Sequence, residues 1–176
     1  STINEIRKDN IKINFKINVK DNTNNQKGAI KLIAKSSIII SDYLMKLKPY
    51  AIFVTGDRYE LLSAVYPAII HNISIFHLHG GEVTLGSFDN YIRNSISMMS
   101  TLHFTGTKKS KERLVKMGVH KSKIFHVGSP SIDPLFFPKL KNKNSLIKEL
   151  KIKFNVKNIL VTYHIEKINI EKNKNE

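Results

Sequence analysis

Short apolar segments alternate with longer amphipathic ones through the middle of the chain, and this order restricts the fold more than any other feature. The apolar segments have the length of buried strands and lie at residues 50–55, 73–79, 102–105 and 123–127. The other segments place apolar residues three and four positions apart, as helices do, at residues 29–47, 59–71, 89–99 and 108–117. Alternating strands and helices with short links predict an α/β fold with a parallel sheet and right-handed crossovers.

Other segments carry weaker patterns. Residues 11–20 alternate strictly between apolar and polar side chains, which predicts a half-buried strand. Pro67 falls inside the second of the expected helices and should kink or break it. Residues 145–151 then read as a helix and residues 159–162 as a strand. Residues 165–176 are charged and rich in asparagine, so they lack an apolar face and we expect them to be frayed.

The composition is that of a globular domain. The chain has 176 residues, 41% of them hydrophobic, which suffices for one domain with a proper core. It contains no cysteine, which excludes disulfides and thiolate metal ligands. The apolar runs are too short to span a bilayer, and the sequence given starts on a polar stretch without an apolar signal region. We therefore expect no membrane association and a cytoplasmic location.

The formal charge of +15 raises the question of nucleic-acid binding. Residues 1–48 carry ten basic and four acidic side chains, a net charge of +6, and so do residues 139–176. Residues 49–138 carry nine and six, a net charge of only +3. The basic excess thus lies on the flanks, where the lysines are not interleaved with the aromatic or arginine side chains typical of a phosphate-tracking surface. We expect no nucleic-acid partner.

Ionisable side chains gather where the strands are expected to end. The densest stretch, residues 77–82, reads His-Leu-His-Gly-Gly-Glu, and its two glycines keep the turn thin. The carboxyl ends of parallel strands line one crevice. We expect four side chains from separate strand ends to share it: Asp57, His79, Glu82 and His164. Asp89 and Arg93 lie one helical turn apart at the start of the next helix, so their face can point into the same crevice.

A metal site is an alternative interpretation of the same stretch. His77 and His79 are two residues apart, so they would point to one face of a strand, and Glu82 could complete a zinc or manganese ligand set. The sequence shows no residues placed to orient these ligands, as metal sites require. We therefore favour a site without a metal.

Several residues have plain structural explanations. Asp57 could cap the helix that follows it. His103 lies in an expected buried strand and should be a core histidine with satisfied hydrogen bonds. Gly128 and Ser129 should form a turn, because a proline follows them. We expect three further histidines to lie at the surface or in loops: His71, His120 and His126.

The order and spacing of these residues resemble the hydrolysing branch of the UDP-N-acetylglucosamine 2-epimerase family. The resemblance spans about residues 49–164. Its motifs are Gly56-Asp57-Arg58-Tyr59-Glu60, His77-x-His79-Gly80-Gly81-Glu82-Val83-Thr84, Asp89-x-x-x-Arg93, Leu102-His103-Phe104, Val127-Gly128 with Asp133, and Val161-Thr162-Tyr163-His164. It implies a Rossmann-like domain of the GT-B type, an active site in a cleft between two such domains, a UDP-N-acetyl-sugar substrate and no cofactor.

The resemblance also implies a reaction. The C2 proton of the sugar is removed while UDP departs, and water adds to the resulting glycal to give N-acetylmannosamine, which requires a positioned base and a stabilised leaving group. Asp57 and Asp89 match the catalytic carboxylates of the family. Arg93 matches a residue that can fix a carboxylate or a substrate oxygen. His164 matches a histidine that acts as an acid or as a phosphate partner.

One position departs from part of the family. Many relatives read His-x-Glu where this chain reads His77-x-His79, and that glutamate is one of their catalytic acids. Either His79 takes over the acid–base role, for which imidazole is suited, or Glu82 reaches into the site. We favour His79 and keep both as candidates. Arg58 and His77 are expected to bind substrate, although His77 is equally suited to bonding backbone alone.

The matching motifs correspond to the later part of the first family domain. We therefore expect residues 1–164 to form an incomplete N-terminal Rossmann-like domain, and residues 165–176 to form a charged tail. The second family domain, which grips UDP, has no counterpart in this sequence. The chain alone should then be inactive, as a folded remnant or as a subunit that pairs with a separately encoded C-terminal domain or with copies of itself. The family context is sialic-acid-type sugar synthesis, and the sequence does not decide the exact UDP-sugar.

Overall fold

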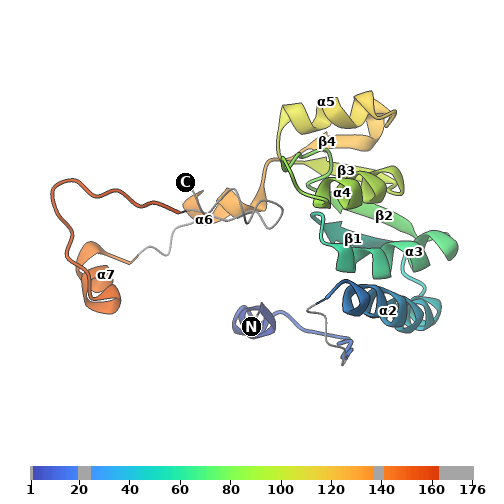
Figure 1. Ribbon diagram of the computed structural model, residues 1–176, viewed down its shortest axis with the longest axis horizontal. Coiled ribbons are helices and arrows are strands. Elements are labelled where there is room, and N and C mark those ends of the chain that lie inside the picture. The colour runs from blue at the N-terminus through green and yellow to red at the C-terminus, as the bar shows by residue number, and fades with distance from the viewer. Residues whose placement is uncertain (1, 20–24, 137–140, 163–176) are drawn as a thin grey trace.

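A parallel sheet of four strands forms the centre of the molecule. The computed structural model describes residues 2–19, 25–136 and 141–162. The strands are β1 (Ala51–Thr55), β2 (Ser74–Leu78), β3 (Leu102–Thr105) and β4 (Ile124–His126), and they lie side by side in that order. All three pairings are parallel (Figure 1). The predicted α/β fold with a parallel sheet is therefore confirmed.

The predicted helices connect these strands. Helix α2 (Gln26–Leu47) precedes β1, and a 3₁₀ turn (Tyr59–Leu61) leads into α3 (Leu62–Ile70) before β2. Helix α4 (Asp89–Met98) joins β2 to β3, and α5 (Lys108–Lys116) joins β3 to β4. Helices α2, α3, α4 and α5 follow one another in the same order as the strands (Figure 1). When strands are added in one direction, right-handed crossovers place the connecting helices on one face of the sheet, as observed.

Local sequence signals explain where the helices begin and end. The Asn25 side chain accepts a hydrogen bond from the Gly28 amide (2.8 Å) at the start of α2. At the other end Lys48 adopts a left-handed conformation, and Pro49 follows. The Thr107 hydroxyl caps α5 by accepting from the Ser110 amide (3.0 Å). These caps satisfy backbone groups that helix ends leave without partners.

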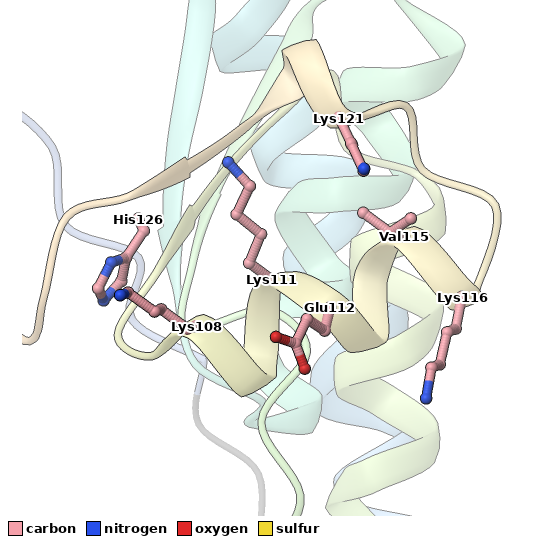
Figure 2. A pocket seen from close by; sticks show the side chains of 7 residues that line it. All are labelled: Lys108, Lys111, Glu112, Val115, Lys116, Lys121 and His126. Atoms are coloured by element: carbon pink, nitrogen blue, oxygen red, sulfur yellow. The ribbon is translucent and has the colours of Figure 1, made fainter.

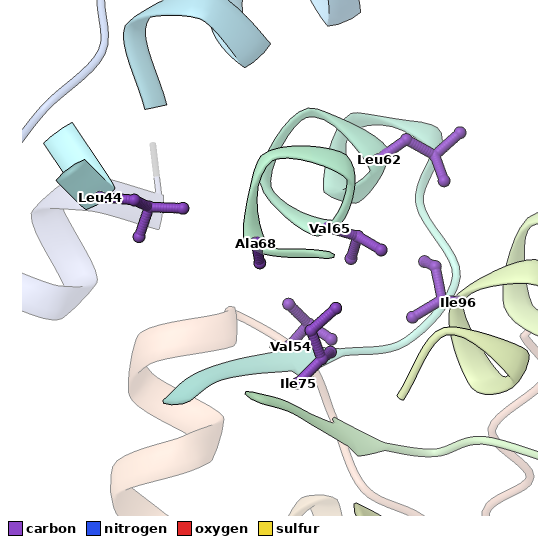
Figure 3. Close-up of a cluster of buried hydrophobic side chains, with 7 residues drawn as sticks. All are labelled: Leu44, Val54, Leu62, Val65, Ala68, Ile75 and Ile96. Carbon is purple, nitrogen blue, oxygen red and sulfur yellow. The ribbon is translucent and has the colours of Figure 1, made fainter. Parts of the chain in front are cut away.

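The core lies between the sheet and the helices. One face of β1 and β2 contributes Val54 and Ile75, which are 5% and 1% exposed. The facing helices contribute the rest of the cluster, namely Leu44, Leu62, Val65, Ala68 and Ile96 (Figure 3). Burial alternates along β3 and along most of β2, as expected where every second side chain packs under the helices. The helices hold together because they bury this continuous apolar face.

The opposite face of the sheet carries a row of phenylalanines, one from each strand. The ring of Phe104 lies 5.7 Å from that of Phe53, 6.2 Å from that of Phe76 and 5.7 Å from that of Phe125, between centroids. Phe53 is 58% exposed and Phe125 46%. Helices normally cover both faces of a parallel sheet. Here the described residues leave much of this aromatic face open.

Two strand predictions are wrong, and the helix break considered at Pro67 is absent. Residues 11–19 form no strand although their side chains alternate, because no neighbouring strand supplies hydrogen bonds; their described ring contact is Phe15 stacked on Tyr43 of α2. Residues 159–162 are likewise unpaired and largely exposed. Helix α3 continues through Pro67 without a break. This proline is buried, so its packing offsets the hydrogen bond that its ring removes.

Four shorter helical segments were not predicted: α1 (Thr2–Lys8), two 3₁₀ turns (Lys121–Lys123 and Pro130–Ile132) and α6 (Asp133–Phe136). The predicted helix at residues 145–151 is present as α7 (Lys143–Leu150). The expected tail at residues 165–176 lies outside the described residues. Among the helices that the structure describes, none combines the length and apolar character needed to cross a bilayer.

Candidate functional site

The side chains of Asp57 and Arg93 meet at the carboxyl end of the sheet. Asp57 lies two residues after the end of β1, and Arg93 projects from the first half of α4. The Arg93 guanidinium donates from Nη2 to Oδ2 of Asp57, forming an ion pair. The Arg93 side chain is 6% exposed and that of Asp57 is 23% exposed. A buried charge of this kind requires a partner, so the pair is a fixed part of the site.

Arg93 also organises the loop between β2 and α4. Its Nη1 donates to the carbonyl oxygen of Glu82 (2.8 Å) and to Oδ1 of Asn90 (3.2 Å). Its Nη2 donates to the Thr84 hydroxyl (3.2 Å) as well as to Asp57. The remaining nitrogen, Nε, is buried without a partner among the described residues. One arginine thus links the loop after β1 to the loop after β2.

His79 and Glu82 form a second pair in the same region. His79 lies just beyond β2 in a left-handed conformation (φ 66°), which turns its side chain out of the strand pattern. Its Nδ1 lies 2.7 Å from Oε1 of Glu82. The pair sits over Gly106 at the end of β3, where an added Cβ would lie 3.1 Å from that carboxylate oxygen. The pair therefore lies at the ends of β2 and β3 and packs against the backbone of Gly106.

The two glycines of the motif are required by close packing. A Cβ on Gly81 would lie 2.2 Å from the carbonyl oxygen of Ser110, closer than any atom tolerates, and its φ is +74°. A Cβ on Gly80 would lie 2.9 Å from the Ser97 hydroxyl. In addition, Arg113 of α5 donates to the Gly81 carbonyl (3.1 Å). The motif's loop is thus held against α4 and α5, which explains its glycines.

His77 is enclosed by protein. It is fully buried, its Nε2 lies 2.8 Å from the carbonyl oxygen of Gly56, and its Nδ1 lies 3.1 Å from the Ser97 hydroxyl. Burial lowers the pKa of His77 below its usual value, although the bond to Gly56 opposes this. Both ring nitrogens are engaged, so in this structure neither is left for a substrate or a metal.

Asp89 and Arg58 lie at the edge of the cluster. The Asp89 carboxylate accepts from the Ser87 hydroxyl (2.8 Å), an arrangement at the start of α4 rather than a contact with Arg93. Arg58 is largely exposed and pairs with Glu60 (2.6 Å). The hydrogen bonds that Arg58 donates to Glu60 raise the pKa of Arg58, and the Asp89 charge adds to this effect, so the two predicted residues share one region. His164 lies outside the described residues.

Two other interpretations of the sequence concerned a metal site at His77, His79 and Glu82 and a core role for His103. The described residues contain no group of three or more histidine or acidic side chains arranged to hold a metal ion, and His77 and His79 do not share a strand face. His103 is buried as predicted, at 1% exposure, but its hydrogen bonds are only partly satisfied: its ring has a hydrogen bond with the Ser100 backbone, whereas Nδ1 has no partner among the described residues. Burial lowers the pKa of His103 to about 4.

Two further residues of the cluster were missed by sequence reasoning. Ser97 lies one helical turn after Arg93, and this spacing could have identified it as a residue of the same face. Gly106 follows β3 directly, where the other strand ends carry predicted site residues. Both positions follow from the helix and strand periods once the elements are placed.

A hollow of about 600 Å³ lies elsewhere, between α5 and β4. Its lining residues are Lys108, Lys111, Glu112, Val115, Lys116, Lys121 and His126 (Figure 2). None of the predicted site residues lines it. Lys111, one of the lysines that line this hollow, donates to the Ile124 carbonyl (3.0 Å). This hydrogen bond connects α5 to the edge strand β4.

Comparison with known proteins identifies the family of this chain. The family model for UDP-N-acetylglucosamine 2-epimerase matches residues 2–176. The chain is 34% identical over 175 residues to a GDP/UDP-N,N'-diacetylbacillosamine 2-epimerase (hydrolyzing) of Campylobacter jejuni, covering 99% of this chain and 45% of that protein. It is 33% identical over 172 residues to polysialic acid biosynthesis protein P7 of Escherichia coli, covering 97% and 44%. The chain thus spans a little under half the length of these relatives.

A solved structure supports the fold. The crystal structure of UDP-GlcNAc 2-epimerase from Neisseria meningitidis bound to UDP-GlcNAc superimposes with a TM-score of 0.69 at 21% identity, covering 86% of this chain and 39% of that one. The Rossmann-like GT-B fold expected from the resemblance is therefore confirmed for the part that the chain spans. With the family model matching nearly its whole length, this chain belongs to the UDP-N-acetylglucosamine 2-epimerase family.

Proposed function

We propose that this chain supplies the acid–base half of the active site of a hydrolysing UDP-N-acetyl-sugar 2-epimerase. The observation that carries the proposal is the convergence of Asp57, Arg93 and the His79–Glu82 pair at one end of the sheet. Arg93 connects both parts, because it contacts the Asp57 carboxylate and the Glu82 backbone. A cluster of this kind at the carboxyl ends of parallel strands suits proton transfer to a bound sugar.

The His79–Glu82 pair is the proposed base for the C2 proton. A carboxylate only accepts, so Nδ1 of His79 donates to Glu82 and leaves Nε2 as the proton acceptor. The His79 side chain is 18% exposed, so it is accessible to a ligand. Glu82 then orients the ring and stabilises the imidazolium that forms on proton abstraction. Both candidates for the altered position thus act together, with His79 transferring the proton.

Asp57 and Asp89 are the proposed carboxylates that act on the sugar beside this base. Arg93 fixes the direction of the Asp57 carboxylate through a hydrogen bond, which is the orientation that proton transfer requires. Arg58 lies exposed in the same region and carries a permanent charge suited to a phosphate oxygen of the substrate. For His164 the proposal rests on the family motif alone. His77 is not among the proposed substrate ligands, because both of its ring nitrogens lie within hydrogen-bond distance of protein groups.

The proposed substrate is inferred from the names of the relatives. It concerns the whole enzyme, of which this chain spans a little under half. The two curated relatives are named for diacetylbacillosamine epimerisation and polysialic acid synthesis, so UDP-N-acetylglucosamine and its diacetamido counterpart are the two candidate substrates. The remaining half of the active site, supplied in the same polypeptide, by a separate chain or by another copy, is expected to hold UDP. A cytoplasmic location, where nucleotide sugars are made, stays a prediction.

The test measures products in D₂O with the polypeptide encoded by the full reading frame that contains this segment. Removal of the C2 proton and hydration of a glycal predict release of UDP and one deuterium at C2 of the N-acetylmannosamine-type product. Asp57→Asn and His79→Leu should each abolish this signal, whereas Glu112→Gln, an exposed carboxylate change on α5, should retain it. UDP release without deuterium at C2, or full activity in either site variant, would refute the proposal. The 176-residue chain alone should release no UDP.

A further inference from the structure

We infer that His77 is a positioning residue that fixes the direction of the Asp57 carboxylate through the Gly56 carbonyl and the Ser97 hydroxyl. This inference rests on the proposed function, because it matters only if Asp57 acts on the substrate. It replaces the substrate-binding role that the sequence suggested for His77. The family motif places a histidine here but does not say what its ring does.

The hydrogen-bond partners determine the tautomer of the ring. The Gly56 carbonyl oxygen can only accept, so Nε2 of His77, 2.8 Å away, carries the proton and donates it. Nδ1 then accepts from the Ser97 hydroxyl at 3.1 Å. The arrangement requires a neutral ring, and the fully buried position of His77 disfavours the charged one. Each nitrogen therefore has one role and one partner.

These contacts form a continuous series that begins and ends at residues of α4. Arg93 of α4 holds the Asp57 side chain, while Ser97, one turn later on α4, holds His77. His77 in turn holds the Gly56 carbonyl, which belongs to the peptide unit directly before Asp57. Helix α4 thus fixes Asp57 from both its side chain and its backbone. A carboxylate restrained on both sides loses little freedom when the substrate binds.

The Gly56 backbone is anchored on its other side as well. Its amide donates to the Leu78 carbonyl (3.0 Å), which continues the pairing of β1 with β2. Its φ of +86° lies in the left-handed region, so the chain turns sharply between the strand and Asp57. The bond from His77 restrains the Gly56–Asp57 peptide unit, which could otherwise rotate more freely. The ring therefore sets the angle at which Asp57 leaves the sheet.

Two variants of His77 separate positioning from folding. Glutamine places its amide nitrogen near the Nε2 position and can still donate to Gly56, whereas asparagine is shorter and reaches only the Ser97 side. In the full-length enzyme His77→Asn should lower kcat about ten- to a hundredfold with KM changed less than about threefold, because a misplaced catalytic group costs rate more than binding. His77→Gln should restore most of kcat.

A measurement without activity keeps this inference distinct from the proposed function. In ¹⁵N NMR spectra of the 176-residue chain, His77 should show a proton on Nε2 and none on Nδ1 at pH 7. The guanidinium resonance of Arg93 should shift in His77→Asn and Ser97→Ala but stay in place in His77→Gln. An Nδ1-protonated ring, or equal effects of the Asn and Gln variants on kcat and on Arg93, would overturn the inference. If the enzyme turns over no UDP-sugar, the proposed function fails and the NMR result still decides the positioning.

Discussion

The guanidinium of Arg93 bonds the carboxylate of Asp57 across 36 positions of sequence, and this contact joins the loop after β1 to helix α4. Asp57 is partly exposed while Arg93 is buried, so the pair leaves the carboxylate accessible to solvent and encloses its counter-ion in protein. The same arginine holds the Glu82 carbonyl (2.8 Å). Of the two roles that the sequence left open for Arg93, fixing a carboxylate or a substrate oxygen, the structure shows the contact with a carboxylate.

Replacing Arg93 by methionine should therefore destabilise the fold as well as the site. Methionine replaces the unbranched stem of the side chain but leaves the Asp57 carboxylate and the Glu82 carbonyl without their donor. We expect a loss of about 3 kcal/mol in the free energy of unfolding, the usual cost of removing one partner of a buried pair. Urea denaturation followed by circular dichroism measures it.

The control for this change is Arg58→Met. Arg58 is exposed and pairs with Glu60 at the surface, so its loss should cost less than about 1 kcal/mol. Equal losses in both variants would show that Arg93 contributes no more than a surface charge. In that case the account of Arg93 as the link between the two loops would be wrong.

The parallel sheet and its helices were predictable because the local sequence of each element indicates its type and its ends. Strand β2 is an apolar run ended by the glycines of its loop, and α2 has a capping asparagine and a following proline. Residues 11–19 show the limit of this reasoning. Their alternation is a property of the sequence alone, whereas a strand also requires a neighbour that accepts its hydrogen bonds.

Gly81 should tolerate no side chain, and Gly118 provides a matched comparison. Both have positive φ, 74° and 98°, so alanine at either position carries a backbone cost of about 1–2 kcal/mol. Only at Gly81 would the new Cβ also meet a backbone oxygen, that of Ser110 at 2.2 Å; at Gly118 nothing lies within 4 Å. Gly81→Ala should thus lower the melting temperature much more than Gly118→Ala. Similar shifts in a thermal melt would contradict the close packing of the loop on α5.

His103 predicts how stability depends on pH. The folded state holds its pKa at about 4, whereas the unfolded chain takes up the proton near the ordinary value of 6.5. Protons therefore favour unfolding in this window, so the contribution of His103 is complete above pH 6.5 and is lost as the pH falls toward 4. The loss should reach about 3 kcal/mol at pH 4. The lowered pKa of His77 acts in the same direction.

Urea denaturation at a series of pH values tests this, with His103→Leu as the variant. Leucine cannot take up a proton, so the variant should lose less stability between pH 6.5 and 4 than the parent chain. Thr105→Val, a buried change of similar shape on the same strand, should keep the parent's acid dependence. An unchanged acid dependence in His103→Leu would show that other groups cause it.

The sequence predicted which side chains would lie near one another better than it predicted their hydrogen-bond partners. Strand ends and the helical spacing brought Asp57, His79, Glu82 and Arg93 to one region, as the structure shows. The sequence could not show that Arg93 bonds Asp57 while Asp89 bonds Ser87. The choice of partner depends on loop conformation, such as the left-handed backbone at His79, which no periodicity of the sequence reveals.

The two faces of β1 should respond differently to the same substitution. Val54 lies under the helices at 5% exposure, whereas its neighbour Phe53 is 58% exposed on the open aromatic face. Threonine is compatible with a strand at both positions, but at residue 54 it would bury a hydroxyl without an evident partner. Val54→Thr should therefore cost about 2 kcal/mol of unfolding free energy, and Phe53→Thr less than about 1 kcal/mol. If denaturation of the 176-residue chain gave the larger loss for Phe53→Thr, this face would be packed against other residues, and the exposure of the phenylalanine row would have to be abandoned.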